Sequence, residues 1–158
     1  MTKNLFFAIF IALSAVLSLT SCTDEKKEMI ESLNYKKACE LKDFPTAYEI
    51  VDKLKEKTSK AKVWYEGHTY LDSAGPEYIA AKEKSDEAER YVVLQESLMV
   101  LESEGSNGLM RIIGIAKEHN AEGWLYSELI DVANKIGDTD LAERIQNIIK
   151  SESEFDTE

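Results

Sequence analysis

The residues best suited to metal or acid–base chemistry are few and poorly spaced in this sequence. Its two histidines, His68 and His119, stand far apart, and neither has a second His or Cys three or four residues away. Zinc ligation from a helix relies on such spacing. We therefore expect both histidines at the surface or at helix ends, and we predict no metal and no cofactor.

Carboxylates are abundant, but their spacing selects no catalytic pair. Glycoside hydrolysis needs two acids facing each other in a cleft, whereas the acids here recur beside Lys and Arg, as on solvated helix faces. The triplet at 138–140 has the Asp-x-Asp form, but between two helices Asp138 is better placed as an N-cap. The Gly-Ser-Asn-Gly stretch at 105–108 lacks the Lys-Ser or Lys-Thr that follows a phosphate-binding loop. We therefore predict that the protein is not an enzyme.

Aromatic side chains are the remaining candidates for recognition. Rings on a concave face stack on sugars or on peptide side chains, and Tyr and Trp are enriched at binding hot spots. Most such rings fill gaps between helices, but Trp64 and Tyr65 are adjacent, so one of them should face solvent. The candidate interaction surface comprises Trp64, Tyr65, His68, Tyr70, Trp124 and Tyr126.

The charge balance limits the partners. The chain has 19 basic and 30 acidic residues, a net charge of −11. Phosphate backbones and anionic lipid surfaces attract basic proteins, so we expect neither nucleic acid nor broad electrostatic adhesion to lipid. A basic partner is compatible with this charge, although solubility explains the acidity equally well.

The first 22 residues have the layout of an export signal. Lys3 precedes an apolar run over residues 5–19, which ends in Leu-Thr-Ser-Cys at 19–22. A helix of about 15 residues rises roughly 22 Å, less than a bilayer core of about 30 Å, so a membrane-spanning anchor is the weaker interpretation. The tetrapeptide resembles the bacterial lipobox. The resemblance implies cleavage before Cys22 and lipid, including palmitate-type acyl chains, on that residue.

The resemblance to lipoproteins also gives an expected location. More than one acyl chain would anchor the protein stably to a membrane. The acidic residues after Cys22 are similar to the surface-export signal of Bacteroidetes lipoproteins, which favours the outer membrane, on either its periplasmic or its surface face. The alternative is an ordinary signal peptide that ends near a cysteine. If Cys22 is lipidated, Cys39 is left as a lone thiol, which we expect to be buried as a small hydrophobe.

The mature chain reads as helical. Apolar residues recur at i, i+3, i+4 and i+7, with almost no alternation of the strand type. The predicted apolar stripes comprise Ala47, Ile50, Val51 and Leu54; Leu94, Leu98 and Leu101; Leu109, Ile112, Ile113 and Ala116; Leu125, Leu129, Val132 and Ile136; and Leu141, Ile145, Ile148 and Ile149. Each stripe is about one helix face wide and must pack on a neighbour.

Short breaks separate these stripes at regular intervals. They fall at 42–45, 73–76, 105–108 and 137–139, with steps of 31 or 32 residues. The residues at 38–50 align with those at 133–145, so Ala38 corresponds to Ala133 and Ala47 to Ala142. This segment resembles the tetratricopeptide hairpin, in which two small residues pack across the turn. The resemblance implies stacked antiparallel hairpins, an α-solenoid of three to four units with about eight helices.

Two departures leave alternatives open. The period is shorter than the family's, and the Trp, Leu-Gly and Tyr of its first helix are out of register. The segment at 82–101 also fits one long helix, which leaves three hairpins, and an irregular helical bundle remains an alternative fold. The expected domains are a signal peptide at 1–21, a tether at 22–27, a helical domain at 28–150 and a disordered acidic tail at 151–158.

Function follows from the two resemblances and not from any catalytic group. Tetratricopeptide-like arrays bind peptides or subunits, so we predict an adaptor or scaffold that holds an unidentified envelope protein. The alternative is a ligand-binding lipoprotein, for example one that binds glycan, in which several of the candidate aromatic rings share an exposed groove.

Overall fold

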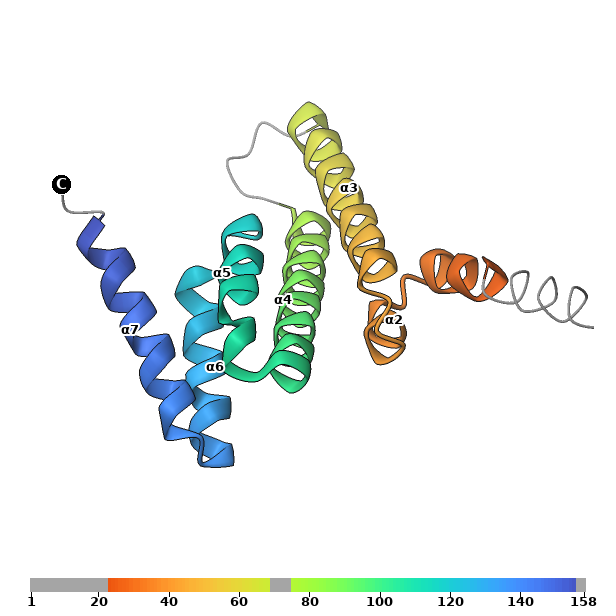
Figure 1. Cartoon of the computed structure of the whole chain (residues 1–158). Helices are drawn as coiled ribbons and strands as arrows, with labels where there is room; N and C mark the ends of the chain where they lie inside the picture. The colour runs from red at the N-terminus through yellow and green to blue at the C-terminus, as the bar shows by residue number, and fades with distance from the viewer. Residues whose placement is uncertain (1–22, 69–74, 156–158) are drawn as a thin grey trace, which may run out of the picture. The chain divides into compact units, whose positions relative to one another are not determined.

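A computed structural model describes the backbone of residues 23–68 and 75–155, and the side chains of residues 23–62 and 75–151. Over these ranges the chain is all α-helical and contains no strand, as the apolar stripes predicted (Figure 1). The leader, the predicted lipidation site Cys22 and the first half of the predicted break at 73–76 lie outside the described residues.

Six α-helices are labelled along the described chain. They are α2 (Tyr35–Glu40), α3 (Phe44–His68), α4 (Pro76–Glu104), α5 (Leu109–Glu118), α6 (Glu122–Ile136) and α7 (Thr139–Phe155). A 3-10 helix, η1 (Gly105–Gly108), joins α4 to α5, and residues 23–32 are also helical. The segment at 82–101 is a single helix, which is one reason why the described ranges do not reach the expected eight.

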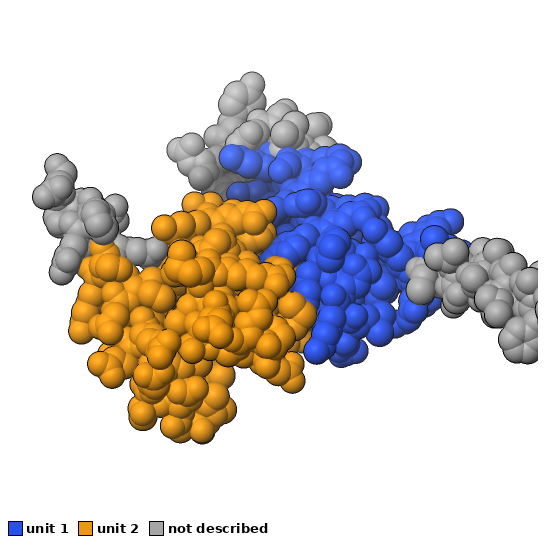
Figure 2. Space-filling model, in the orientation of Figure 1, with its two compact units in different colours: residues 1–86 blue, residues 87–158 orange. Residues whose placement is uncertain are grey.

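The chain divides into two compact units, coloured separately in Figure 2. Unit 1 is Met1–Asp86 and unit 2 is Glu87–Glu158, so the boundary falls within α4.

Unit 1 is built on the packing of α2 against α3. The apolar stripe predicted for α3 is buried, with Ile50 fully enclosed. Cys39 is also buried, at 7% exposure, as expected for a lone thiol that acts as a small hydrophobe. These residues make the unit's core with Met29, Tyr35, Ala38, Phe44, Ala47, Val51 and Leu54.

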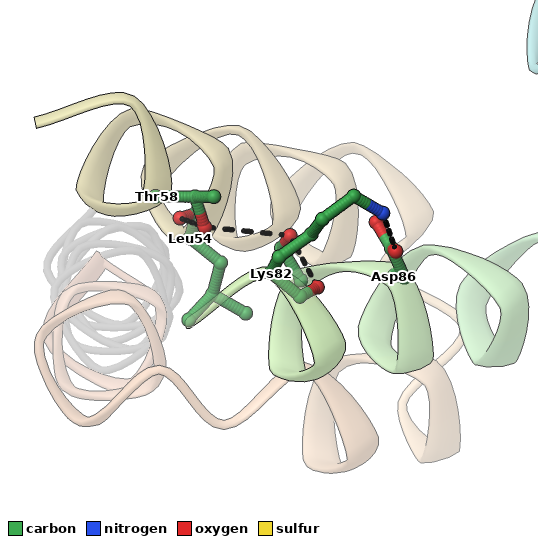
Figure 3. A network of polar contacts seen from close by, with 5 residues as sticks. Leu54, Thr58, Lys82 and Asp86 are labelled. Atoms are coloured by element: carbon green, nitrogen blue, oxygen red, sulfur yellow. Dashed lines mark hydrogen bonds and ion pairs between the residues drawn. The ribbon is translucent and has the colours of Figure 1, made fainter. Parts of the chain in front are cut away.

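A chain of hydroxyl hydrogen bonds joins α3 to the first turns of α4 in unit 1 (Figure 3). The Thr58 hydroxyl lies 3.0 Å from the Leu54 carbonyl oxygen, to which it donates, and 3.5 Å from the Ser85 hydroxyl. Ser85 is 3% exposed and donates to the Lys82 carbonyl at 2.9 Å. These bonds give a buried polar side chain its partners, which avoids the cost of an unsatisfied hydroxyl.

In unit 2, α6 and α7 pack along each other and α5 packs on α6 (Figure 1). The core takes Leu125 and Leu129 from α6 and Ile145 from α7, all predicted stripe residues. The buried positions of α4 in this unit are Ala88, Val92, Val93, Ser97 and Val100, whereas the predicted stripe at Leu94, Leu98 and Leu101 is only partly buried.

One turn geometry recurs at four helix junctions. A residue with positive φ ends the first helix: Leu33 (55°), Lys42 (58°), Asn120 (48°) or Gly137 (78°). The amide of the next residue then bonds the carbonyl five residues earlier, at 2.7–2.9 Å in the four turns, and its own carbonyl accepts the first bond of the following helix. The first of these bonds is that of a Schellman cap, so each helix ends and the next begins across two residues.

The alignment of residues 38–50 with 133–145 holds in three dimensions at the level of the turn. Asp43 and Asp138 both cap the following helix, with Oδ1 accepting the amide three residues on, at 3.2 and 3.0 Å. The four small residues Ala38, Ala47, Ala133 and Ala142 are all buried. Two of the four recurrent turns, at 33–34 and 120–121, were not predicted, because neither has a Gly-Asp or Lys-Asp signature.

The ends of the helical region extend beyond the expected boundaries. Residues 23–27, assigned as a tether, are helical, and Glu25 lies 3.1 Å from Lys37 while Lys26 lies 3.6 Å from Glu49. At the other end α7 continues to Phe155, past residue 150 where we expected the domain to end. The first residues of the predicted acidic tail are thus helical, since α7 has no glycine or proline to stop it.

Candidate functional site

An apolar groove in unit 2 is lined entirely by described residues. It has a volume of about 310 Å³ and runs between the C-terminal ends of α4 and α6, beside η1 and the start of α7. Its lining is largely aliphatic: Leu98, Leu101, Val132, Ile136 and Leu141, with Glu102, Gly105, Ser106 and Asp138 completing it.

The local sequence explains why this groove stays open. Ile136 is the last residue of α6, and Gly137 turns the chain away at once with φ 78°. α6 is packed as far as Ala133, which is fully buried, whereas Val132 is half-buried and Ile136, at the end of the helix, is 69% exposed. Exposing a large aliphatic side chain is unfavourable by roughly 1.5–3 kcal/mol relative to full burial. The end of the α6 stripe is therefore available to a partner.

The predicted interaction surface is not assembled by the described side chains. Tyr126 was assigned to that surface wrongly: it is 3% exposed, because it shares the buried face of α6 with Leu125 and Leu129. Trp124 is partly exposed, and the Arg90 guanidinium lies 4.8 Å from its ring centre, a cation–π geometry. Arg90 also lies 3.5 Å from Glu128, so Trp124 belongs to a polar cluster on α4 and α6 and does not line the groove.

The other candidate residues lie outside the described side chains. This holds for Trp64, Tyr65 and His68, of which only the backbone in α3 is described, and for Tyr70, which lies between the described ranges.

The residues suited by type to metal or acid–base chemistry have structural roles. His119 caps the end of α5, with Nδ1 lying 3.3 Å from a Glu89 carboxylate oxygen, in agreement with its expected place at a helix end. Asp138 caps α7, and Asp140 pairs with Arg144 at 2.8 Å. Among the residues that the structure describes, no cluster of His, Cys, Asp or Glu is arranged to hold a metal ion.

Two shifted pKa values mark exposed ion pairs in unit 1. A hydrogen bond from Lys60, reinforced by its charge, lowers the pKa of Glu56 below 4.5. In the same way, Asp86 raises the pKa of Lys82 above 10.5. Both pairs sit at i, i+4 on solvent-facing helix surfaces, a spacing that brings such side chains together. They therefore stabilise helices and do not mark a reactive site.

The groove brings together residues that were predicted to belong to different features. Its aliphatic lining comes from predicted stripes, and Gly105, Ser106 and Asp138 come from predicted breaks. The available signal was an apolar pair just before each break: Leu98 with Leu101, and Val132 with Ile136. Such a pair at the end of an amphipathic helix has no further turn of neighbouring helix to cover it.

Within the described residues, no helix is both long enough and apolar enough to cross a bilayer. Comparison of the chain with protein-family models, with curated proteins and with solved structures finds no match. The groove and its surroundings are therefore the basis for inferring function.

Proposed function

We propose that this chain is a bacterial envelope lipoprotein, anchored through lipid on Cys22, whose helical domain binds a partner protein in the groove of unit 2. The observation that carries the proposal is the exposed aliphatic lining, with Ile136 69% exposed beside the partly buried Leu98 and Leu101. Clustered aliphatic side chains of this kind, rimmed by polar residues, mark interaction sites on proteins.

A protein partner fits the groove better than a glycan does. Glycan recognition was expected to bring several aromatic rings into one groove, and no aromatic side chain lines this one. Its volume of about 310 Å³ is at the small end of the range for ligand pockets, and five of its nine lining residues are aliphatic. Aliphatic side chains of a partner protein suit both the small volume of the groove and its aliphatic lining.

The repeated turn supports a tetratricopeptide-like arrangement of hairpins as the scaffold for this groove. Four junctions share one hydrogen-bonding pattern, and buried alanines flank two of them. Closely packed antiparallel helices leave apolar helix ends at the edges of such an array. The proposed adaptor role rests on this scaffold and needs no catalytic group.

The interaction is tested in cells by replacing Ile136 with a photoreactive benzoylphenylalanine. Irradiation should give one dominant protein adduct from position 136. The matched control is the same replacement at Met110, an exposed α5 residue (76%) that does not line the groove. Identical adducts from both positions, or none at 136 across growth conditions, would exclude the groove as the partner-binding site.

The anchor is tested separately. Cys22→Ser should leave the protein unprocessed or released from the membrane fraction, because the lipid is attached to the cysteine sulfur. Fractionation followed by immunoblotting measures this. A variant that is still cleaved and still sediments with membranes would rule out lipidation at Cys22.

A further inference from the structure

The charge around the groove is one-sided. Glu102 and Asp138 are the ionisable residues that line it, and no Lys or Arg contributes to the lining. Both residues are exposed at the edge of the aliphatic lining, and Asp138 also caps α7 through Oδ1. A partner that buries its apolar side chains in the groove must bring its flanking charges close to these carboxylates.

The end of α4 adds to this negative potential. α4 and α6 both end at the groove, and a helix C-terminus carries roughly half a negative charge from its unsatisfied carbonyl groups, which Lys135 offsets in the last turn of α6. Basic residues usually occupy such an end, but the last turn of α4 has none and holds Glu102 and Glu104 instead. Arg111 lies 3.0 Å from Glu104, which balances that carboxylate. Glu102 lines the groove and adds a second carboxylate to this last turn, at a helix end where positive charge is favoured.

The whole of unit 2 reinforces the local charge. It contains 16 acidic and 6 basic residues, a net charge of −10 of the chain's −11. A field of one sign accelerates the encounter with an oppositely charged partner and disfavours partners of like charge.

The shape of the lining restricts how a peptide can bind. Strand addition requires a sheet edge, and the described chain has no strand. Recognition of a proline-rich segment uses an aromatic-lined groove, and recognition of a phosphate uses clustered arginines; this groove has neither. The remaining common mode lays the apolar face of an amphipathic helix into an aliphatic groove, with side chains at i, i+3 and i+4 as anchors.

We infer that the groove of unit 2 binds a positively charged amphipathic helix of its partner protein, with aliphatic anchors between Leu98, Leu101, Val132 and Ile136 and flanking Lys or Arg near Glu102 and Asp138. This inference rests on the proposed function, because it specifies the chemistry of the partner at the same groove. Aliphatic burial supplies the affinity, and the acidic rim selects for positive charge.

The test uses the membrane-purified full-length protein in neutral phosphatidylcholine nanodiscs, with empty nanodiscs as the blank. The probe is a fluorescent synthetic peptide of about 14 residues with leucines on one helical face and lysines elsewhere. A second peptide has glutamates in place of the lysines, and a third has the leucine and lysine order scrambled. Fluorescence anisotropy should show the lysine peptide binding at least about tenfold more tightly than either control peptide.

Paired variants assign the binding to the groove. Ile136→Lys should weaken binding of the lysine peptide by about tenfold or more, while Met110→Lys, at a similarly exposed aliphatic position, should leave it unchanged. Glu102→Gln should weaken binding and flatten its dependence on salt, because it removes a rim charge. Glu118→Gln, an exposed acid outside the groove, serves as its control. Thermal unfolding of each variant verifies that it is folded.

Each outcome has a distinct meaning. Equal binding of the glutamate or scrambled peptide, or equal loss in the Ile136 and Met110 variants, overturns the inference. If no peptide binds but position 136 still crosslinks one protein in cells, the inferred partner chemistry is wrong and the proposed function stands. If both experiments fail, the proposed function fails with it.

Discussion

Unit 1 holds 13 basic and 14 acidic residues, whereas unit 2 holds 6 and 16. In unit 1 many charges are balanced within one helix, as in the i, i+4 pairs of Lys60 with Glu56 and Lys82 with Asp86. In unit 2 the acids outnumber their possible partners. Because both units use the same turn between helices, this difference concerns the surface and not the folding pattern. The same turn therefore occurs in a unit with nearly balanced charges and in a strongly acidic one.

The largest expected effect comes from emptying each core in turn. Leu129→Ala in unit 2 and Ile50→Ala in unit 1 each remove a fully buried aliphatic side chain, which should cost about 2–5 kcal/mol of stability. If the two units open separately, native-state hydrogen exchange will show that Leu129→Ala lowers amide protection in α5–α7 far more than in α2 and α3, and that Ile50→Ala does the reverse.

Met110→Ala controls for this pair, because Met110 is 76% exposed and its loss should change little. A uniform loss of protection across both units in either core variant would mean that the chain unfolds as one cooperative block. In that case the comparison between units would describe surfaces alone.

A smaller effect is expected where η1 approaches α4 beside the groove. A Cβ added at Gly108 would lie 2.6 Å from Val100 Cγ1 and 3.2 Å from the Val100 carbonyl oxygen, and Val100 is fully buried. Gly108→Ala should therefore destabilise the protein by about 1–3 kcal/mol through overpacking. Urea denaturation followed by circular dichroism measures the change.

The matched control is Gly114→Ala in the middle of α5. Apart from its chain neighbours and the backbone of its own helix, no atom lies within 4 Å of a Cβ added there, so alanine should stabilise the helix by about 0.5–1 kcal/mol. Changes of the same sign in both variants would contradict the close approach of η1 to α4.

The recurrent turn allows a direct exchange between units. Gly137 has φ 78°, and a Cβ there would meet no neighbouring atom, so Gly137→Ala tests backbone strain alone and should cost about 1 kcal/mol. Lys42 holds the equivalent position in unit 1 at φ 58°. Lys42→Gly should stabilise the protein by about 0.5 kcal/mol, because glycine relieves the strain of the positive φ but also raises the conformational entropy of the unfolded chain.

Thermal unfolding of the two variants and of their combination measures these changes, which should add because the turns are independent. A loss of stability in Lys42→Gly would show that the lysine side chain contributes more than its backbone strain costs.

The sequence predicted the helices better than it predicted the site, and particular residues show why. Periodic apolar residues indicate which face of a helix packs, so Ile50, Leu129 and Ile145 were placed correctly. Periodicity does not show where packing stops along a helix, which is why Ile136 was grouped with the core although it is 69% exposed. The extent of burial depends on the neighbouring helix, and that neighbour is fixed only by the tertiary fold.

The turns and the aromatic residues show the same limit. Gly137 with Asp138 has a recognisable cap signature. Leu33 and Asn120 adopt the same positive φ, but the sequence around them does not indicate a helix cap. Tyr126 looked suited to a binding surface by residue type, but its position next to Leu125 on α6 buries it. Residue type indicates which side chains can bind a partner, but only the position on the helix determines whether such a side chain is exposed.

The smallest expected effect concerns the charge pairs that balance unit 1. Lys60 holds the pKa of the exposed Glu56 carboxyl below 4.5, so the folded state favours the ionised form. The stability contributed by this pair is present above the unfolded pKa and is lost as the pH falls through the lowered folded pKa. Carbon-detected NMR titration of the Glu56 carboxyl should give a midpoint below 4.5, and Lys60→Gln should move that midpoint back toward it. If Lys60→Gln leaves the midpoint unchanged, the ion pair does not form in solution. The near neutrality of unit 1 would then reflect similar numbers of acidic and basic residues without pairing between neighbours.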